Sequence, residues 1–224
     1  MKNETKIYLA DVSGLFDEEV FAGYYKTVSQ RRQKKTDRMR RREGKCLSLG
    51  VELLLKKACE DFGIRYEDEV IVENKYSKPS FSGSNIQFNL SHSGERVMCI
   101  MSEHEVGCDV EQTDKANIAI AKRFFSEEEV KQIQAFSNVE AQAECFCRIW
   151  TLKESFIKCF GRGLSVPLNE FSVLTDLKPA GLIQSIDDFK YSLGEYDAKD
   201  GYRYSWCIRG EDGDCSIEEV SFGS

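Results

Sequence analysis

Two long segments of helical periodicity, separated by a group of short extended segments, constrain the fold of this chain most. Apolar residues recur at spacings of three and four from about 37 to 62, which predicts an amphipathic helix. A second long helix is predicted over 139–160, ending at Gly161 and Gly163, because glycine suits a helix C-terminus. The strands predicted around these helices lack the regular rhythm of a doubly wound fold, so we expect a mixed α/β (α+β) architecture.

Strands are predicted where short apolar runs are bounded by turn residues, over 7–12, 70–72, 86–90, 97–101, 106–110, 171–174, 189–193, 202–208 and 216–220. Proline and glycine predict a loop over 78–84. The segment Ser91-His92-Ser93-Gly94-Glu95 is predicted as a turn between two strands. Ser126, followed by three glutamates, is typical of a capped helix start.

The composition is that of a soluble protein, with 41% hydrophobic and 31% charged residues. A chain of 224 residues fits one large domain or two small ones. No apolar run reaches the length of a signal peptide or of a membrane-spanning helix, so we expect no membrane partner. The nine cysteines are odd in number and several have apolar neighbours, which predicts free thiols and a cytoplasmic location.

Basic residues crowd the segment 26–45, although the net charge of the chain is −7. The acidic total and the absence of a recognisable motif argue against a nucleic-acid-binding protein. The basic segment is compatible with a contact for an anionic ligand and equally with a solvated helix face.

A pair of carboxylates lies in the predicted strand that contains Gly107-Cys108-Asp109-Val110-Glu111. Side chains alternate along a strand, so Asp109 and Glu111 should project from the same face. Paired carboxylates repel each other unless a cation or a shared proton intervenes, and hard oxygen ligands suit Mg²⁺. The alternative for this pentapeptide alone is an exposed edge with two solvated acids.

Two further segments have both a functional and a structural interpretation. Glu154 and Lys158 are four residues apart on the second long helix, and the commonest explanation of that spacing is a surface ion pair. The functional alternative is a metal ligand next to a phosphate contact, and periodicity does not choose between the two. Ser91 and His92 could both bind a phosphate, whereas a Ser-His turn is more often structural. A catalytic serine is not supported, because no nucleophile-elbow glycines surround it, and two histidines without a C-x-x-C pair do not support a zinc site.

Taken together and in order, these segments resemble the surfactin-synthetase-activating type of the 4'-phosphopantetheinyl transferase superfamily. The resemblance extends from about 38 to 168 and is carried by Lys78-Pro79 and by the motifs at 88–94, 107–111, 124–129 and 150–155, continuing through Lys158 to 161–165. It implies two similar α/β halves, 1–105 and 106–224, related by a pseudo-twofold axis, with coenzyme A and the active site in the cleft between them.

The resemblance also implies roles for individual residues. Asp109, Glu111 and Glu154 would bind Mg²⁺, or Mn²⁺ in its place, beside the pyrophosphate of coenzyme A. Lys158 would contact that pyrophosphate, with Lys153 near the same site. The nucleotide end of coenzyme A would be held by Ser91 and His92 at its phosphates and by Lys78 and Arg38 near the adenine and 3'-phosphate, while Lys45 would take the place of an arginine that the family often carries.

The implied reaction moves 4'-phosphopantetheine from coenzyme A to a serine of an apo acyl or peptidyl carrier protein and releases 3',5'-ADP. In this reaction Glu154 and Lys158 would be the catalytic residues, with Glu154 or a metal-bound water as the base. A monomer is expected because both halves of the cleft belong to one chain. The alternatives are a noncatalytic module that binds coenzyme A or a nucleotide, and a magnesium-dependent nucleotide hydrolase. The sequence does not disclose which carrier protein is the acceptor or whether acylated coenzyme A is used.

Overall fold

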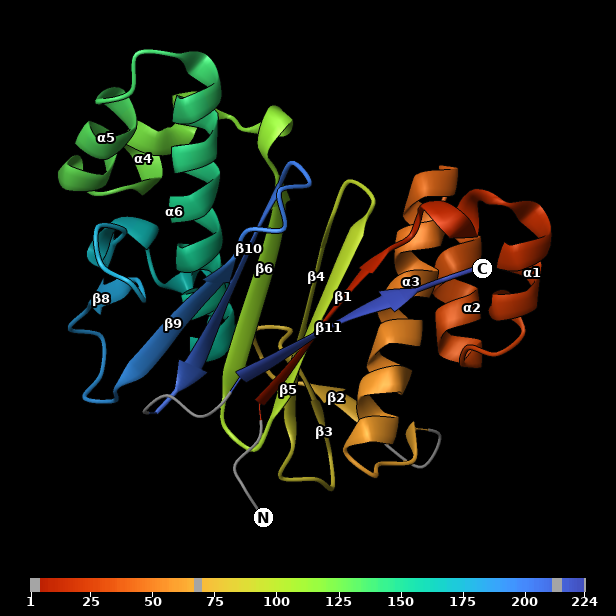
Figure 1. The fold of residues 1–224 in the computed structure, drawn as a ribbon. Coiled ribbons are helices and arrows are strands. Elements are labelled where there is room, and N and C mark those ends of the chain that lie inside the picture. The colour runs from red at the N-terminus through yellow and green to blue at the C-terminus, as the bar shows by residue number, and fades with distance from the viewer. Residues whose placement is uncertain (1–4, 67–69, 211–214, 224) are drawn as a thin grey trace.

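The computed structural model describes residues 5–66, 70–210 and 215–223. The helices are α1 Glu18–Tyr25, α2 Gln30–Asp37, α3 Arg42–Asp61, α4 Ala121–Phe124, α5 Glu127–Gln134 and α6 Val139–Phe160, with short 3-10 turns at Ser13–Phe16, Thr113–Lys115, Ile118–Ile120, Gly163–Ser165 and Leu168–Glu170. The strands are β1 Thr5–Asp11, β2 Ile71–Glu73, β3 Pro79–Phe81, β4 Gln87–Ser93, β5 Arg96–Ser102, β6 Val106–Gln112, β7 Ser172–Leu174, β8 Gly181–Ile183, β9 Tyr191–Tyr196, β10 Tyr202–Arg209 and β11 Cys215–Ser221. The mixed α/β architecture predicted from the sequence is confirmed (Figure 1).

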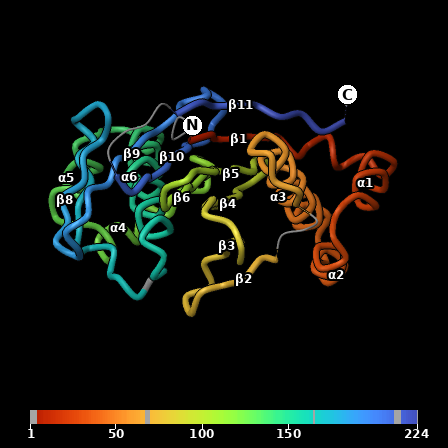
Figure 2. The backbone as a smooth tube through the Cα atoms, turned by 90° about the horizontal axis from the view of Figure 1, so that it is seen from below, coloured from red at the N-terminus to blue at the C-terminus, as the bar shows by residue number. Residues whose placement is uncertain are grey.

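Two sheets form the middle of the molecule, and each packs against one long helix. The first sheet has the strand order β11-β1-β5-β4 and the second has the order β6-β10-β9. Figures 1 and 2 show α3 on the outer side of the first sheet and α6 on the outer side of the second. The two sheets also pack against each other, so each is covered on both faces. Strands covered in this way need apolar side chains on both faces, and this applies to β1, β5, β6 and β10.

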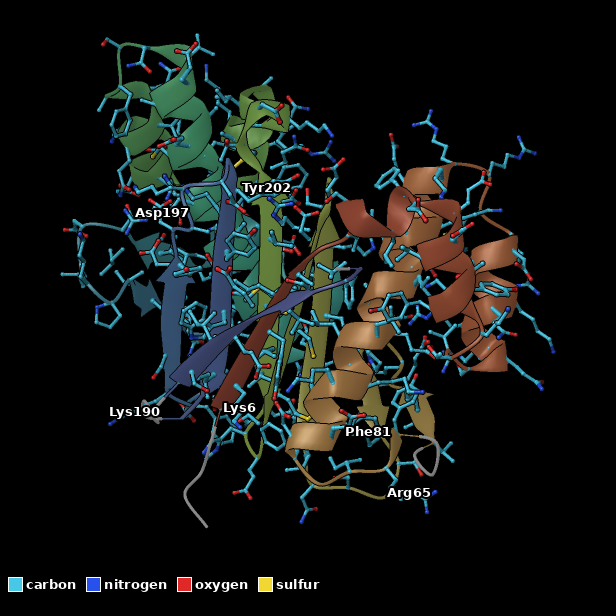
Figure 3. The ribbon with its side chains drawn as sticks, turned by 45° about the vertical axis from the view of Figure 1, so that its right-hand side comes forward. Lys6, Arg65, Phe81, Lys190, Asp197 and Tyr202 are labelled. Carbon is cyan, nitrogen blue, oxygen red and sulfur yellow. The ribbon has the colours of Figure 1, made fainter. Side chains whose placement is uncertain are left out.

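The buried residues follow that expectation. Tyr8 and Cys99 belong to the apolar cluster under α3, which also contains Phe81 beside the lower end of that helix (Figure 3). The opposite face of the same sheet contributes Ile7 and Ile100 to a cluster shared with the second sheet, where Val106, Cys108, Val110, Tyr202, Tyr204 and Ile208 meet them. A third cluster lies between the second sheet and α6.

The long helices show where periodicity predicts structure well. Helix α6 has the predicted bounds and ends at Gly161, whose φ of 76° is a left-handed conformation that favours glycine. The helix predicted over about 37–62 is confirmed as α3, which begins later than predicted because Asp37 ends α2 and Arg41 has an extended backbone. The capping box at Ser126 is confirmed, with Ser126 and Glu129 bonding each other's backbone N–H groups.

Two predictions for the segment before β5 were wrong. Residues 79–81 of the predicted loop form β3, which pairs with β2, and Pro79 is tolerated because it opens a short two-stranded ribbon. The predicted turn at 91–95 is shorter, since Ser91, His92 and Ser93 continue β4 and pair with β5. The side chains of β4 therefore alternate through this segment instead of projecting from a turn.

The chain crosses between the two sheets twice. It passes from β5 in the first sheet to β6 in the second around residue 105, close to the predicted boundary of the halves. It then returns, because β11 pairs in parallel with β1. A half bounded by 106–224 thus contributes its last strand to the sheet of the other half, and the pseudo-twofold relation between the halves stays a prediction.

Two properties of the described residues bear on the environment of the chain. All nine cysteines lie in the described segments, and none of them forms a disulfide. None of the described helices combines the length and apolar character that crossing a lipid bilayer requires.

Candidate active site

Strand β6 presents Asp109 and Glu111 toward α6. In the register with β10, Asp109 lies opposite Ser205 and Glu111 opposite Arg203, on the face of the second sheet that α6 covers. Helix α6 approaches closely because Gly107 has no side chain: a Cβ there would lie 2.1 Å from the carbonyl oxygen of Ser155. The two acids are consequently held against the helix that carries Glu154 and Lys158.

Lys158 lies at the centre of this group. Its ammonium donates to Asp109 Oδ1 at 2.7 Å, to the carbonyl oxygen of Cys108 at 3.0 Å and to Ser91 Oγ at 3.1 Å. Burial opposes the charged ammonium, but the neighbouring Asp109 outweighs it and raises the pKa of Lys158. Lys158 therefore bonds to an acid of β6 and not to Glu154, the partner that helical spacing suggests.

Three carboxylates share the space around this lysine. Burial, followed by the charge of Asp109, raises the pKa of Glu154 to about 7, with Glu111 adding to the effect and Lys158 opposing it. The pKa of Glu111 is raised by the same two causes, burial first and Asp109 second. The acids are thus close enough to disfavour each other's ionised form, which a bound cation would relieve.

The carboxylates do not form a complete metal cage. Among residues 5–66, 70–210 and 215–223, no three His, Cys, Asp or Glu side chains converge as a metal site. However, Asp109 Oδ2 is buried and accepts no hydrogen bond in the described structure, so it retains a lone pair for a cation. Mg²⁺ needs only one or two carboxylates in addition to water and phosphate oxygens, and this donor set fits that requirement.

Ser91 and His92 project from opposite faces of β4. Ser91 is buried, and its hydroxyl donates to Asp109 Oδ1 at 2.8 Å. His92 is more exposed and lines a separate cavity next to α2 and α3. Loss of hydration, followed by the positive charges of Lys158 and Lys35, lowers the pKa of His92. An anion bound in that cavity would offset these positive charges, raise the pKa of His92 and so favour the protonated imidazole.

The cavity next to His92 has a volume of about 360 Å³ and combines basic and apolar walls. Its basic residues Arg31 and Arg32 are paired with Glu73 and Glu52, respectively. Lys35 has no carboxylate within ion-pair distance among the described residues, and burial, Arg32 and Arg31 lower its pKa. The apolar lining includes Leu47, Val51, Leu55, Phe88 and Leu90. The sequence had shown only a basic segment, because periodicity does not reveal which of its side chains turn inward.

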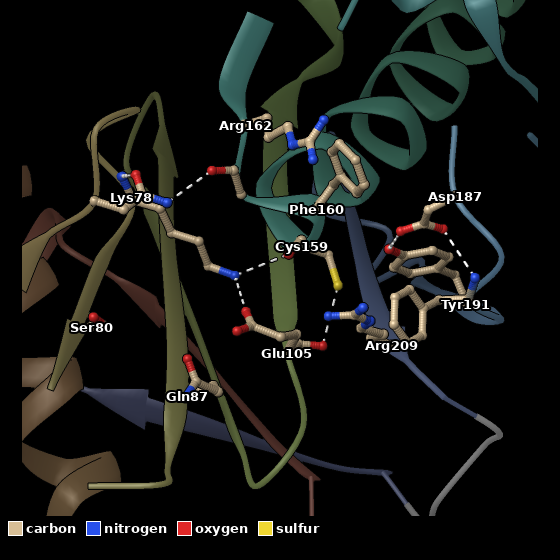
Figure 4. Close-up of a pocket in the computed structure, with 13 residues that line it drawn as sticks. Lys78, Ser80, Gln87, Glu105, Cys159, Phe160, Arg162, Asp187, Tyr191 and Arg209 are labelled. Carbon is tan, nitrogen blue, oxygen red and sulfur yellow. Dashed lines mark hydrogen bonds and ion pairs between the residues drawn. The ribbon is translucent and has the colours of Figure 1, made fainter. Parts of the chain in front are cut away.

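Lys78 lies on the opposite side of the β2–β3 ribbon. Its ammonium donates to Glu105 Oε2 at 2.6 Å and to the carbonyl oxygen of Cys159 at 3.0 Å, in a second cavity of about 420 Å³ (Figure 4). Asn74 Nδ2 also donates to the carbonyl oxygen of Gly161 across this cavity. These contacts connect the β2–β3 ribbon to the end of α6. The Lys78 ammonium therefore does not line the cavity that contains His92.

Arg38 and Lys45 lie on either side of the junction between α2 and α3. Arg38 follows the last turn of α2 and is exposed, while Lys45 is half-buried in the first turns of α3. Neither belongs to the lining of the cavity that contains Lys35 and His92. Their contact with a nucleotide stays a prediction.

Lys153 requires a correction. Its side chain is 0% exposed, and its ammonium donates to Glu129 Oε1 at 2.7 Å and to the carbonyl oxygen of Phe171 at 2.6 Å. Glu129 Oε1 in turn accepts from the backbone N–H of Val173. A lysine enclosed in this way cannot reach a ligand, so it connects α5, α6 and β7 instead of lying near a pyrophosphate. Local sequence patterns do not reveal this ion pair because Glu129 is distant from Lys153 along the chain.

Comparison with known proteins agrees with the residues assembled here. The model of the 4'-phosphopantetheinyl transferase superfamily matches residues 105–207, which include β6 and α6. The 4'-phosphopantetheinyl transferase gsp of Aneurinibacillus migulanus is 32% identical over 192 residues, which cover 85% of this chain and 80% of that protein. The 4'-phosphopantetheinyl transferase Sfp of Bacillus subtilis is 29% identical over 220 residues, which cover 97% and 98% of the two chains.

A solved holo-(acyl-carrier-protein) synthase of Bacillus anthracis, in complex with coenzyme A, is similar over 48% of this chain and 96% of its own, at 17% identity and a TM-score of 0.41. That likeness is too small to support an argument. The similarity to gsp and Sfp extends over most of both chains and confirms the resemblance drawn from the motifs. The chain belongs to the 4'-phosphopantetheinyl transferase superfamily and, within it, to the surfactin-synthetase-activating type.

Proposed function

We propose that this chain moves 4'-phosphopantetheine from coenzyme A to a serine of an apo acyl or peptidyl carrier protein, in a reaction that depends on Mg²⁺ or Mn²⁺. The observation that carries the proposal is the group around Lys158, in which Asp109, Glu111 and Glu154 from two elements share one region of negative charge. In a protein that only bound a nucleotide, three acids at this position would repel the phosphates and weaken the binding.

The basic cavity of α2 and α3 supports the placement of coenzyme A. Its apolar wall suits an adenine ring, and Lys35 provides a positive charge that no carboxylate of the described residues pairs with. His92, whose pKa is lowered by loss of hydration and by Lys158 and Lys35, can gain a proton beside a bound anion. We place the nucleotide end of coenzyme A in this cavity. The pyrophosphate would then extend from His92 toward Lys158, whose positive charge already acts on that imidazole and helps to lower its pKa.

Asp109, Glu111 and Glu154 would hold the cation, with the free Oδ2 of Asp109 as one ligand. When bound, the cation neutralises negative charge that develops on the pyrophosphate during transfer. Lys158 adds a second positive group at the leaving phosphate, while Ser91 orients Asp109 through its hydroxyl.

The transfer forms a bond between the carrier serine oxygen and the β-phosphorus of coenzyme A. It breaks the bond between that phosphorus and the bridging oxygen, which leaves with 3',5'-ADP. We assign the serine proton to Glu154, directly or through a bound water, because its carboxylate is half-buried beside Lys158 and interacts with both acids of β6. Lys158 keeps its own proton throughout.

Intact-mass spectrometry of a panel of apo acyl and apo peptidyl carrier proteins, incubated with coenzyme A and Mg²⁺, tests the proposal. We expect a mass gain of one phosphopantetheine group, the appearance of 3',5'-ADP in equal amount, and the loss of both when EDTA is added. Release of 3',5'-ADP without a carrier would instead identify a hydrolase. Binding of coenzyme A without any mass gain across the panel would identify a noncatalytic module.

A further inference from the structure

Side-chain hydrogen bonds join the two sheets where β4 of the first sheet meets β6 of the second. Strands β4 and β6 lie side by side but belong to different sheets, with no backbone ladder between them. Alternate residues of β4 supply the missing acceptors: Asn89 Oδ1 accepts from the N–H of Cys108 at 3.0 Å, and Ser91 Oγ from that of Val110 at 3.3 Å. Ser93 Oγ accepts from the N–H of Gln112 at 3.3 Å. We call Asn89, Ser91 and Ser93 the seam residues.

Ser91 and Ser93 each make a second hydrogen bond, which is not needed to hold the two strands together. Ser91 donates its hydroxyl proton to Asp109 Oδ1, and Ser93 donates to Glu111 Oε2, both at 2.8 Å. Each serine therefore connects an acid of β6 to the N–H of the residue that follows that acid. The arrangement repeats after two residues on both strands, since side chains of a strand alternate with that period.

The choice of residue follows the position of the acids. Asn89 stands beside Gly107 and Cys108, where β6 carries no carboxylate, and there an acceptor is sufficient. Ser91 and Ser93 stand beside Asp109 and Glu111, and a hydroxyl can accept and donate through the same oxygen. The seam thus provides one donor for each acid of β6 from the opposite half of the molecule.

We propose that Ser93 is a positioning residue that orients Glu111 for cation binding, as Ser91 does for Asp109. This inference rests on the proposed function. When one oxygen of a carboxylate accepts a fixed hydrogen bond, the group is already oriented and loses less conformational entropy when its other oxygen binds a metal. Loss of such a hydrogen bond to a metal ligand lowers metal affinity by about 10- to 100-fold in other proteins. Ser93 is the better test of the two because Ser91 also contacts Lys158.

The experiment measures Mn²⁺ binding by electron paramagnetic resonance of the free ion, with coenzyme A present, and the Mg²⁺ concentration that half-activates transfer. For Ser93→Ala we expect the Mn²⁺ Kd and the half-activating Mg²⁺ concentration both to rise about 10-fold, with kcat at saturating metal changed far less. Ser93→Thr keeps the hydroxyl and should restore both values. Ser93→Cys, which keeps the volume but is a weak donor, should shift them as alanine does.

Ser102→Ala is the matched control. Ser102 also bridges two strands through its hydroxyl, at 2.8 Å from Thr5 Oγ1, but it touches no acid of β6. Its loss should lower thermal stability and leave metal affinity unchanged. An Mn²⁺ Kd for Ser93→Ala within about two-fold of wild type, or an equal shift for Ser102→Ala, would overturn the positioning role. A wild-type chain that binds Mn²⁺ but transfers nothing would overturn the proposed function instead, and the binding measurement would still decide the role of Ser93.

Discussion

The buried ion pair of Lys153 and Glu129 allows a sharp prediction for the variant Lys153→Met. The two side chains are 0% and 1% exposed, so removal of the ammonium leaves the charge of Glu129 enclosed without a counter-ion. Breaking a buried pair in this way typically costs about 3–5 kcal/mol. Glu129 would keep its bonds from the N–H groups of Ser126 and Val173, which places the expected loss near the lower limit.

A loss of about 3 kcal/mol in the free energy of unfolding corresponds to a Tm about 6–12 °C lower for a chain of this size. Urea denaturation followed by tryptophan fluorescence measures the free energy directly. The double variant with Glu129→Gln should lose less than the sum of the single variants, because no isolated charge remains in it. Lys199→Met is the control, since Lys199 is paired with Asp197 at the surface and should contribute less than about 1 kcal/mol.

A loss below about 1 kcal/mol for Lys153→Met would refute this reasoning, because it would mean that Glu129 finds water or a proton without unfolding the region. The result also bears on function. If Lys153 touched a phosphate, its loss would raise the KM for coenzyme A at full stability. We expect the opposite pattern, with lowered stability and an unchanged KM in the fraction that remains folded.

Three further variants test the remaining parts of the site. Glu154→Gln should lower kcat about 10²–10⁴-fold at saturating Mg²⁺, while calorimetry shows coenzyme A still bound; a near-normal rate would remove Glu154 from the role of base. Lys35→Gln should raise the KM for coenzyme A about 10-fold, whereas Lys34→Gln, which does not line the cavity, should not; equal effects would disprove a specific contact of Lys35 with the ligand. Gly107→Ala should cost about 1–3 kcal/mol or more of unfolding free energy, because its Cβ meets the backbone of α6, whereas Gly83→Ala has open space and should stay within about 0.5 kcal/mol of wild type.

Local patterns predicted the parts of the site that a single element determines. The alternation of β6 placed Asp109 and Glu111 on one face, and the apolar stripe with its terminal glycine defined α6. Both signals are contained in about 20 consecutive residues, within the reach of the 2.0 and 3.6 periodicities.

Partners that are distant along the chain could not be predicted in this way. Lys158 bonds to Asp109, 49 residues away, although Glu154 stands at the favourable spacing on its own helix. Ser91 and Ser93 belong to a strand because β5 and β6 lie on either side of them, whereas their own composition is typical of a turn. The motif resemblance supplied the grouping of these residues but not the bonds between them.

The return of β11 to the first sheet has a consequence for how the molecule forms. The outer edge of β1 finds its partner in the last strand, so the first sheet cannot be completed until the residues of β11 have left the ribosome. Until then β1 exposes an open edge of the kind that recruits other chains. The first half of the chain therefore lacks one strand of its own sheet. We expect a gene fragment that ends after β6 to yield aggregates, whereas a separable domain would yield soluble protein.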